Sequence, residues 1–300
     1  MIATLIKRFM ARLSIIIVNF NSGELLTQCV RSVLASTIPV TVHVVDNAST
    51  DESLPRLEQT ITHDKRVQVI KNVSNLGFAR AANLALPYTK GQYLLFLNPD
   101  CLIHPDTLAH FVRIMDKNPQ AGMAGCLVRN LDGSEQAGCR RSIPSPWRAL
   151  VRIFHLDKLF PHFKHFKSFV LSNQPLPTKP IEIEGISGAC MFVRHTALDV
   201  VGPMDEAYFL HCEDLDWFMR FRAKHLSILF IPDIEVVHVK GGCSHKQPIR
   251  VLWYKHRGIV RFYRKFFHDQ YAQPFLWGIT LAVWVRFCLL ATWILIKSVF

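Results

Sequence analysis

The segment Tyr93–Asp100 has the sequence YLLFLNPD and predicts a strand that brings a carboxylate to the edge of a sheet. Its apolar residues Leu94–Leu97 run unbroken to a polar stop at Asn98, as in the buried strands of parallel sheets. In open α/β sheets, ligands bind beyond the carboxyl ends of the strands, so we expect Asp100 to face a substrate or a metal ion. The alternative is an aspartate that only caps a helix beginning near His104.

Three further apolar segments rich in β-branched residues precede this one and alternate with segments of helical periodicity. They are Leu13–Val18, Val40–Val45 and Val67–Ile70. Strands and helices that alternate in this way form βαβ units and hence a parallel sheet. Asn19 and Asp46 follow the first two strands, so we expect them to lie with Asp100 at one edge of the sheet. No GxGxxG pattern follows the first strand, which argues against an ordinary dinucleotide-binding fold.

A second acidic centre lies in the sequence HCEDLDWFMR, residues 211–220. Adjacent carboxylates in a largely apolar setting repel each other, so at least one of Glu213 and Asp214 should have a raised pKa and could act as a base near neutral pH. Together with Asp216, they also suit the first turn of a helix, where the helix dipole favours negative charge. Both interpretations can hold at once.

Histidines occur in two different settings. His238 follows two strand-like segments, Ile228–Ile231 and Ile234–Val237, and could bind a metal together with Asp100; alternatively it has no chemical role. The basic, aromatic and proline-rich span 144–180 predicts loop and short helix. It contains three histidines with lysine and phenylalanine neighbours, which we expect to face solvent or membrane: His155, His162 and His165.

Composition restricts the class of partner. The chain has 300 residues, half of them hydrophobic, which is ample for a substantial core. Its formal charge of +12, from 35 basic and 23 acidic residues, points to nucleic acid, phosphorylated small molecules or an anionic membrane. The eight cysteines form no CxxC pair, so neither a zinc site nor a disulfide framework is indicated, and a reducing compartment is expected.

The C-terminal part of the sequence predicts membrane association. Residues 275–296 carry one charge, Arg286, and are numerous enough to cross a bilayer. A central arginine costs roughly 2.5–3.5 kcal/mol on insertion, so a helix that lies in the interface is an alternative, as is a core helix. Six basic residues interleaved with aromatic side chains precede this segment and suit an anionic bilayer surface better than nucleic acid: Arg250, Lys255, Arg257, Arg261, Arg264 and Lys265.

Taken together, the motifs resemble those of family 2 glycosyltransferases, and most closely the rhamnosyltransferase-type members that act on cell-envelope glycans. The resemblance covers residues 13–245 and rests on the motifs VNFN, VVDNASTD, NLGFARAAN, LNPD, GISGAC, HCEDLDWFMR and HVKGG, in that order. It implies the GT-A fold, an α/β fold with a Rossmann-like mixed sheet flanked by helices. Residues 1–12 would then form a basic tail, 13–245 the catalytic domain and 246–300 a membrane-associating helical segment.

The resemblance also implies an activity. This is inverting transfer of a sugar, with L-rhamnose from dTDP-rhamnose expected, to a lipid-linked, lipopolysaccharide or other polysaccharide acceptor, assisted by Mg²⁺ or Mn²⁺. The enzyme would work at the cytoplasmic face of the inner membrane, held peripherally or by one C-terminal anchor, without a nucleic-acid partner. Alternatives are a UDP-hexose or UDP-N-acetylhexosamine donor and, from another class, a non-catalytic membrane scaffold or a nucleic-acid binder.

Site residues follow from the same resemblance, motif by motif. Asp100 matches the last aspartate of the family's DxD motif, while Asn98 replaces the first, so the metal would depend more on His238. Asp214 matches the catalytic base, with Glu213 in support. The nucleotide sugar would contact Phe20, Asp46 (at the base), Gly77, Arg80, Asn98 and Asp100. The acceptor would contact Gly188, Asp216 and Trp217.

Overall fold

The computed structural model describes residues 13–62, 64–154, 156–160, 162–166, 169–239 and 247–299. The predicted basic tail at residues 1–12, His155 and most of the HVKGG motif lie outside these residues. His162 and His165 are both exposed, as expected.

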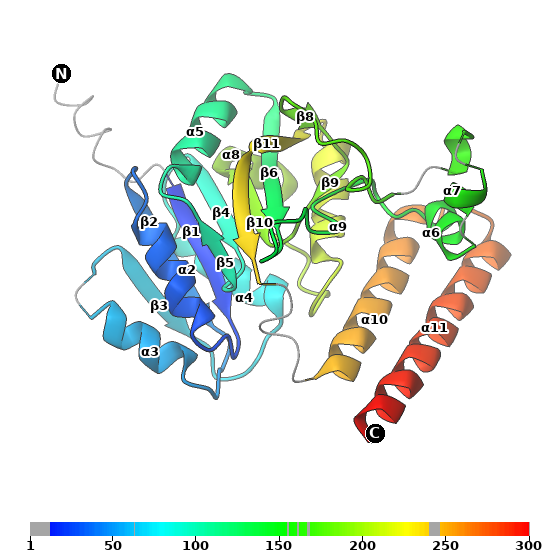
Figure 1. Cartoon of the computed structure of the whole chain (residues 1–300), viewed down its shortest axis with the longest axis horizontal. Helices are drawn as coiled ribbons and strands as arrows, with labels where there is room; N and C mark the ends of the chain where they lie inside the picture. The colour runs from blue at the N-terminus through cyan, green and yellow to red at the C-terminus, as the bar shows by residue number, and fades with distance from the viewer. Residues whose placement is uncertain are drawn as a thin grey trace.

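A mixed nine-stranded sheet forms the centre of the fold and is flanked by helices (Figure 1). The strand order is β3-β2-β1-β4-β10-β6-β11-β5, and β8 pairs with β11. The strands of this sheet are β1 (Leu13–Asn19), β2 (Val40–Asp46), β3 (Val67–Lys71), β4 (Tyr93–Leu97), β5 (Cys101–Ile103), β6 (Ala121–Arg129), β8 (Ile181–Glu182), β10 (Cys190–Arg194) and β11 (Ser227–His238). A separate two-stranded sheet pairs β7 (Arg140–Arg141) with β9 (Gly185–Ile186).

The first four strands are parallel, as the alternation of strands and helices predicts. Every residue of β1 and β4 is buried, which explains why both read as continuous apolar runs. Because Asn19 and Asp46 are register partners at the ends of β1 and β2, their side chains reach the same sheet edge as the residues that follow β4. Strand β10 then runs antiparallel between β4 and β6 and makes the sheet mixed.

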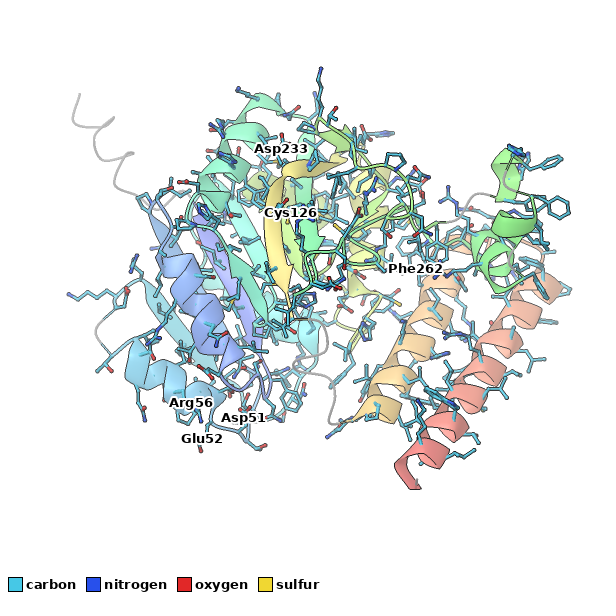
Figure 2. The ribbon with its side chains drawn as sticks, in the orientation of Figure 1. Asp51, Glu52, Arg56, Cys126, Asp233 and Phe262 are labelled. Atoms are coloured by element: carbon cyan, nitrogen blue, oxygen red, sulfur yellow. The ribbon has the colours of Figure 1, made fainter. Side chains whose placement is uncertain are left out.

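Helices connect the strands and extend the fold at its C-terminus. They are α2 (Leu25–Leu34), α3 (Ser53–Thr60), α4 (Phe78–Ala85), α5 (Thr107–Lys117), α6 (Pro146–Ile153), α7 (Leu156–Leu159), α8 (His195–Val201), α9 (Glu213–Ala223), α10 (Pro248–Phe267) and α11 (Gln273–Val299), with 3₁₀ turns η1 (Leu86–Tyr88) and η2 (Lys164–Phe166). The predicted acidic first turn of a helix is that of α9. Cys126 of β6 and Phe262 of α10 are both buried in one hydrophobic core (Figure 2).

The prediction of two separate strands before His238 is wrong, because one continuous strand, β11, covers both segments. Its register against β6 shifts between Ile231 and Glu235, the stretch that contains Pro232. A bulge accommodates a proline that cannot donate to the ladder, so the strand continues past it. Strand β11 therefore reaches the sheet edge, where His238 pairs in register with Cys101 of β5.

Helices α10 and α11 lie side by side as an antiparallel pair (Figure 1). Trp253 of α10 packs against Trp284 and Phe287 of α11, with ring centroids 4.8 and 5.5 Å apart. By length and composition, α11 could cross a membrane, and only 6% of its most apolar window is buried. The alternative of a core helix at this position is therefore wrong.

Candidate active site

A cavity of about 690 Å³ opens at the carboxyl edge of the sheet, next to Asp100 and His238. We call it the donor cavity. Its walls come from the ends of β1, β2 and β4, the segment before α4, the 209–211 segment and the first turns of α10. The lining residues that matter for its chemistry are Phe20, Asn47, Gly77, Asn98, Asp100, Gln136, His238 and Arg250.

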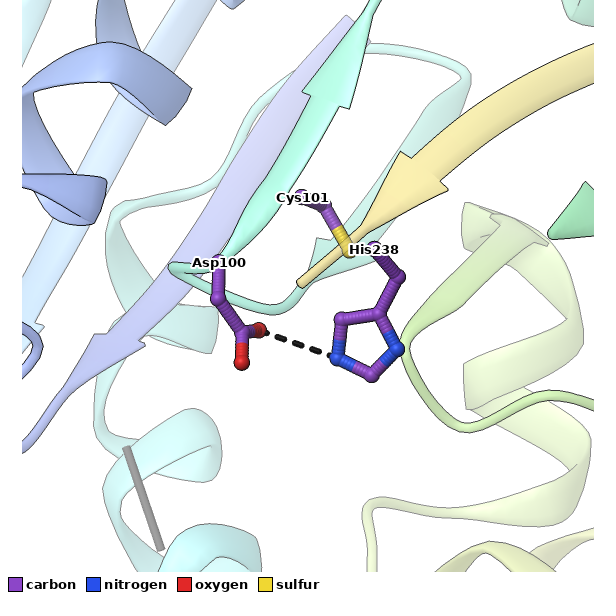
Figure 3. Close-up of side chains that lie close together, drawn as sticks. All are labelled: Asp100, Cys101 and His238. Atoms are coloured by element: carbon purple, nitrogen blue, oxygen red, sulfur yellow. Dashed lines mark ion pairs between the residues drawn. The ribbon is translucent and has the colours of Figure 1, made fainter. Parts of the chain in front are cut away.

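Asp100 and His238 face each other in this cavity, with 3.0 Å between carboxylate Oδ1 and imidazole Nε2 (Figure 3). On the other side of the ring, His238 Nδ1 lies 2.7 Å from Gln136 Oε1. The amide of Gln136 donates to Asn130 Oδ1 at 2.9 Å, so its oxygen faces the ring and Nδ1 carries a proton.

The Asp100 carboxylate and the His238 imidazole form a donor set that suits a divalent metal. Carboxylate oxygen and imidazole nitrogen are both ordinary metal ligands, and ligating histidines commonly donate their other N–H to an oxygen that orients the ring. Asp100 and His238 would hold the ion and Gln136 would orient the histidine. The alternative that Asp100 caps the following helix is wrong, because the N-cap of α5 is Asp106.

Cys101 lies in the same group of potential ligands, within 4.8 Å of the other two, but it is not suited to bind a hard cation. Its side chain is fully buried, and burial together with the charge of Asp100 raises the pKa of the thiol. The thiol donates to Ala189 O at 3.5 Å. Cys101 therefore remains a protonated packing residue, since Mg²⁺ and Mn²⁺ prefer oxygen ligands.

Phe20, Gly77 and Asn98 line the donor cavity, where the resemblance places the nucleotide sugar. Gly77 has a φ of 83°, and a Cβ there would lie 2.4 Å from the carbonyl oxygen of Phe209. This position therefore requires glycine, because both the backbone conformation and the close approach exclude a side chain.

Asp46 and Arg80 are not among the lining residues, which revises two sequence expectations. Asp46 is 4% exposed, and its two oxygens accept hydrogen bonds from Asn19 Nδ2 at 2.7 Å and from the Ser49 amide at 3.1 Å. Its neighbour Asn47 lines the cavity instead. Arg80 is largely exposed and lies 3.7 Å from Glu206 in an ion pair.

Asp214 lies in the first turn of α9, and two groups hold its carboxylate. Its Oδ2 pairs with the guanidinium of Arg141, and its Oδ1 accepts from the Leu215 amide at 2.8 Å. A Cβ at Gly188 would lie 3.0 Å from Oδ2, so this glycine leaves space beside the carboxylate. His211 and Cys212, with φ of 68° and 71°, adopt the left-handed conformation immediately before the helix. Such strain in non-glycine residues is common at functional sites.

Glu213 precedes Asp214 in the first turn of α9 and, unlike Asp214, is buried. Burial, followed by the charge of Asp214, raises the pKa of Glu213 to about 8. This is the raised pKa that the adjacent carboxylates predict. Glu213 is therefore mostly protonated at neutral pH.

Gly188 and Ala189 connect the two acidic centres. Gly188 lies beside the Asp214 carboxylate, where a Cβ would be 3.0 Å from Oδ2, while the carbonyl of Ala189 accepts from the Asn98 amide at 2.9 Å and from the Cys101 thiol. Two consecutive residues thus join the candidate base to the LNPD motif, although 114 positions separate Asp100 from Asp214. Asp214 itself is not among the residues that line the donor cavity, whereas His211 of the same segment is.

The prediction that Trp217 and Asp216 contact the acceptor is wrong. Trp217 is fully buried, packs edge-on against Phe96 of β4 at 5.2 Å, and donates its indole N–H to Gly202 O. Asp216 is also fully buried and forms ion pairs with Arg220 and Lys265. Both side chains lie on faces of α9 that point into the protein.

Four site residues were not predicted to have these roles: Asn47, Gln136, Arg141 and Arg250. Asn47 lies in a motif that the sequence does single out, and only the direction of its side chain was missed. Arg250 was assigned to the membrane-binding segment, but it lines the donor cavity, with its guanidinium over the rings of Phe209 and Tyr254. No local pattern marks Gln136 or Arg141, because each acts through a partner far along the chain.

The sequence model described as "Glycosyl transferase family 2" matches residues 14–201. An N-acetylglucosaminyl-diphospho-decaprenol L-rhamnosyltransferase of Mycobacterium tuberculosis is 26% identical over 279 residues, 88% of each chain. Rhamnosyltransferase WbbL of Escherichia coli is 25% identical over 175 residues, 54% of this chain and 60% of WbbL.

Among solved structures, a mannosyltransferase of Pyrobaculum calidifontis in complex with GDP-mannose and Mn²⁺ aligns with a TM-score of 0.59 at 17% identity. The alignment covers 90% of this chain and 68% of the archaeal one. This likeness shows that the two chains share a fold.

Proposed function

Because the chain belongs to glycosyl transferase family 2, we propose that it transfers L-rhamnose from dTDP-rhamnose to the saccharide of a lipid-linked acceptor in the cell envelope. The names of two relatives support rhamnose as the sugar, and one of these names specifies a diphospho-decaprenol acceptor. Membership of this family favours the glycosyltransferase over the alternatives of a scaffold or a nucleic-acid binder.

The observation that carries this proposal is the connection between the two acidic centres through Gly188 and Ala189. Glycosyl transfer needs a base for the acceptor hydroxyl and a separate cationic centre for the diphosphate leaving group. The short connection holds Asp214 and the Asp100–His238 pair in one fixed relationship. A sugar that reaches from the donor cavity toward Asp214 would present its anomeric carbon between them.

The residues divide the reaction as follows. Asp214 accepts the proton of the acceptor hydroxyl as that oxygen attacks the anomeric carbon, and attack from the side opposite the leaving group inverts the configuration. Arg141 positions the Asp214 carboxylate, and Arg250 meets the donor diphosphate in the cavity. A divalent cation bound by Asp100 and His238, Mg²⁺ or Mn²⁺, would neutralise the charge that develops on the departing diphosphate.

Calorimetric titration of the detergent-solubilised protein tests the donor. We expect dTDP-rhamnose to bind more tightly than UDP-glucose or UDP-N-acetylglucosamine, and all binding to weaken when EDTA replaces Mn²⁺. Transfer of radiolabelled rhamnose to a short-chain N-acetylglucosaminyl-diphospho-prenol then tests the reaction. A preference for a uridine donor would contradict the assignment of rhamnose as the transferred sugar. If no donor bound, the assignment of the donor cavity as the nucleotide-sugar site would be wrong.

We further propose that α11 lies in the membrane interface instead of crossing the bilayer. Arg286 donates to His256 Nε2 of α10 at 3.0 Å, and His256 Nδ1 donates to Leu252 O at 2.7 Å. Burial lowers the pKa of His256, so its neutral ring can accept from a cation. Arg286, the single charge of residues 275–296, therefore has a partner on α10, which carries many exposed cations and cannot follow α11 into hydrocarbon.

The opposite face of α11 suits the interface. Apolar residues at four-residue intervals are exposed along it: Trp277, Leu281, Val285, Leu289 and Trp293. With the basic residues of α10 beside it, this face would enter the acyl boundary of an anionic leaflet at the cytoplasmic side, where the nucleotide sugars are.

Cys288 offers a native probe of this orientation, because it is exposed and close to the middle of α11. A fluorophore on Cys288, in a Cys243→Ser background, would be quenched most by lipids spin-labelled near the headgroup if α11 lies in the interface. Strongest quenching by labels at the acyl-chain ends would show instead that α11 spans the bilayer.

A further inference from the structure

A second cavity, of about 750 Å³, adjoins the donor cavity and has a basic lining. The two cavities share Phe209, Leu210, His211 and Tyr254, so they lie on either side of one short segment and one side chain of α10. We call the second one the basic cavity. Trp284 of α11 contributes to the wall of the basic cavity, so this cavity lies beside the helix that has the exposed apolar face.

The basic character comes from one face of α10. Arg257, Arg261, Arg264 and Lys265 follow at helical spacing and all line the cavity. Asp205 pairs with Arg261 at 3.0 Å and with Lys265 at 2.8 Å, and the buried Asp216 also pairs with Lys265. The two carboxylates thus pair with two of the four cations.

The remaining two cations provide the binding charge. In the part of the chain that the structure describes, no carboxylate forms a salt bridge with Arg257 or Arg264, and both are exposed. Their paired neighbours hold the helix face in place, so two guanidinium groups are available for an anion without loss of an existing ion pair. Guanidinium groups match phosphate oxygens in a bidentate geometry.

We propose that the basic cavity binds the diphosphate of the lipid-linked acceptor, with Arg257 and Arg264 as its principal contacts. This inference rests on the proposed function and specifies how that site takes its second substrate. The lipid chain would leave past Trp284 along the apolar face of α11 into the bilayer. The saccharide would extend along the 209–211 segment, which leads directly into Glu213 and Asp214.

The same chemistry could come from an anionic phospholipid headgroup, but the position of the cavity favours the substrate. A headgroup needs only a charged outer surface, whereas this cavity adjoins the donor cavity through four common residues. The segment that separates them carries the left-handed His211 and Cys212 that set the start of α9. An acceptor held by its diphosphate in the basic cavity and a donor held in the donor cavity would therefore bring their sugars together at the candidate base.

Binding of farnesyl diphosphate to the full-length protein in neutral detergent micelles tests this proposal. EDTA and excess dTDP would be present, so that the donor cavity does not compete for the probe. We expect the double variant Arg257→Gln/Arg264→Gln to bind at least about tenfold more weakly than wild type, as for loss of two charge-assisted phosphate contacts. Lys255→Gln, on the same helix but outside the cavity lining, is the matched control and should bind as wild type does.

Two further measurements complete the test. Sedimentation with phosphatidylglycerol vesicles should be similar for the double variant and for Lys255→Gln. If the double variant instead bound vesicles more weakly but kept its affinity for farnesyl diphosphate, the proposal would be overturned in favour of a headgroup site. Equal farnesyl diphosphate affinity in all three proteins would also overturn it. Donor affinity measured with Mn²⁺ should be unchanged in the double variant, whereas wild-type protein that binds no donor would count against the proposed function alone.

Discussion

Arg141 of β7 forms an ion pair with Asp214 of α9, across 73 positions of sequence. The guanidinium also lies over the ring of Phe218, 5.7 Å from its centroid, so one α9 side chain supports the arginine that orients another. The candidate base is thus positioned by a strand of the small second sheet and not by its own helix alone.

Asp214→Asn should lower the turnover number by at least about 10²–10⁴-fold, because the amide cannot accept the acceptor proton. Donor affinity measured by calorimetry should change little, since Asp214 does not line the donor cavity. Asp199→Asn, an exposed substitution on α8, is the matched control. Turnover close to that of wild type would remove Asp214 from the role of base.

Arg141→Gln should lower the turnover number by about tenfold or more without raising the KM for the donor, because it releases the Asp214 carboxylate from a charge-assisted contact. Arg141→Lys keeps the charge and should restore part of the rate. Steady-state kinetics of both variants separate these effects. A rise in donor KM with unchanged turnover would place Arg141 in donor binding instead.

Gly188→Ala should reduce turnover more than donor affinity, because its Cβ would lie 3.0 Å from Asp214 Oδ2 and occupy the space beside the carboxylate. Gly278→Ala on α11, where a Cβ meets no atom within 4 Å, is the control and should leave turnover and donor affinity unchanged. If the Gly188 variant kept full activity, the acceptor hydroxyl would have to approach Asp214 from another side.

Gln136→Leu should weaken metal-dependent donor binding by about 10–100-fold, since the amide oxygen orients His238 through its Nδ1. Asp100→Ala should abolish the difference between titrations with Mn²⁺ and with EDTA. Paired calorimetric titrations measure both effects. Donor affinities that do not depend on metal in the wild type would contradict the assignment of Asp100 and His238 as ligands.

Glu213 should make the protein less stable as pH rises. Its pKa is about 8 in the folded state and 4.5 as the ordinary value, so the folded state binds the proton more tightly than the unfolded state. The free energy of unfolding therefore falls between about pH 4.5 and pH 8, by the linkage relation. Glu213→Gln should flatten this decline, so the melting temperature of the variant relative to wild type should rise from pH 5 to pH 8.5. A constant difference across this range would argue against a buried, protonated Glu213.

The strand pattern and the two acidic centres could be predicted from the sequence because they depend on local order. Apolar segments such as Leu94–Leu97 show buried parallel strands directly, and the residues that follow them must lie at the strand ends. The proline in β11 misled the same reasoning, since Pro232 interrupts the pattern but not the strand.

The directions of individual side chains were harder to predict. Asp46 and Asn47 are adjacent at a strand end, and only the folded chain shows that Asn47 faces the donor cavity. Trp217 lies one helical turn after Asp214, yet it enters the core against Phe96 because α9 packs on the sheet. Small differences in helix rotation decide such cases, and sequence spacing does not report them.

The sequence by itself determined the α/β fold, the sheet edge that carries Asp100 and the acidic first turn of α9, because these follow from periodicity and from the order of segments. Only the tertiary structure decided which distant residues meet there. Gln136 reaches His238 because its backbone amide bonds back to Val128 near the end of β6, the sheet neighbour of β11, and Arg141 reaches Asp214 from a strand of the small sheet. His256 likewise meets Arg286 only when α10 and α11 pack together, and the basic cavity arises only from that packing. Contacts of this kind depend on strand order and helix docking, which no local pattern records.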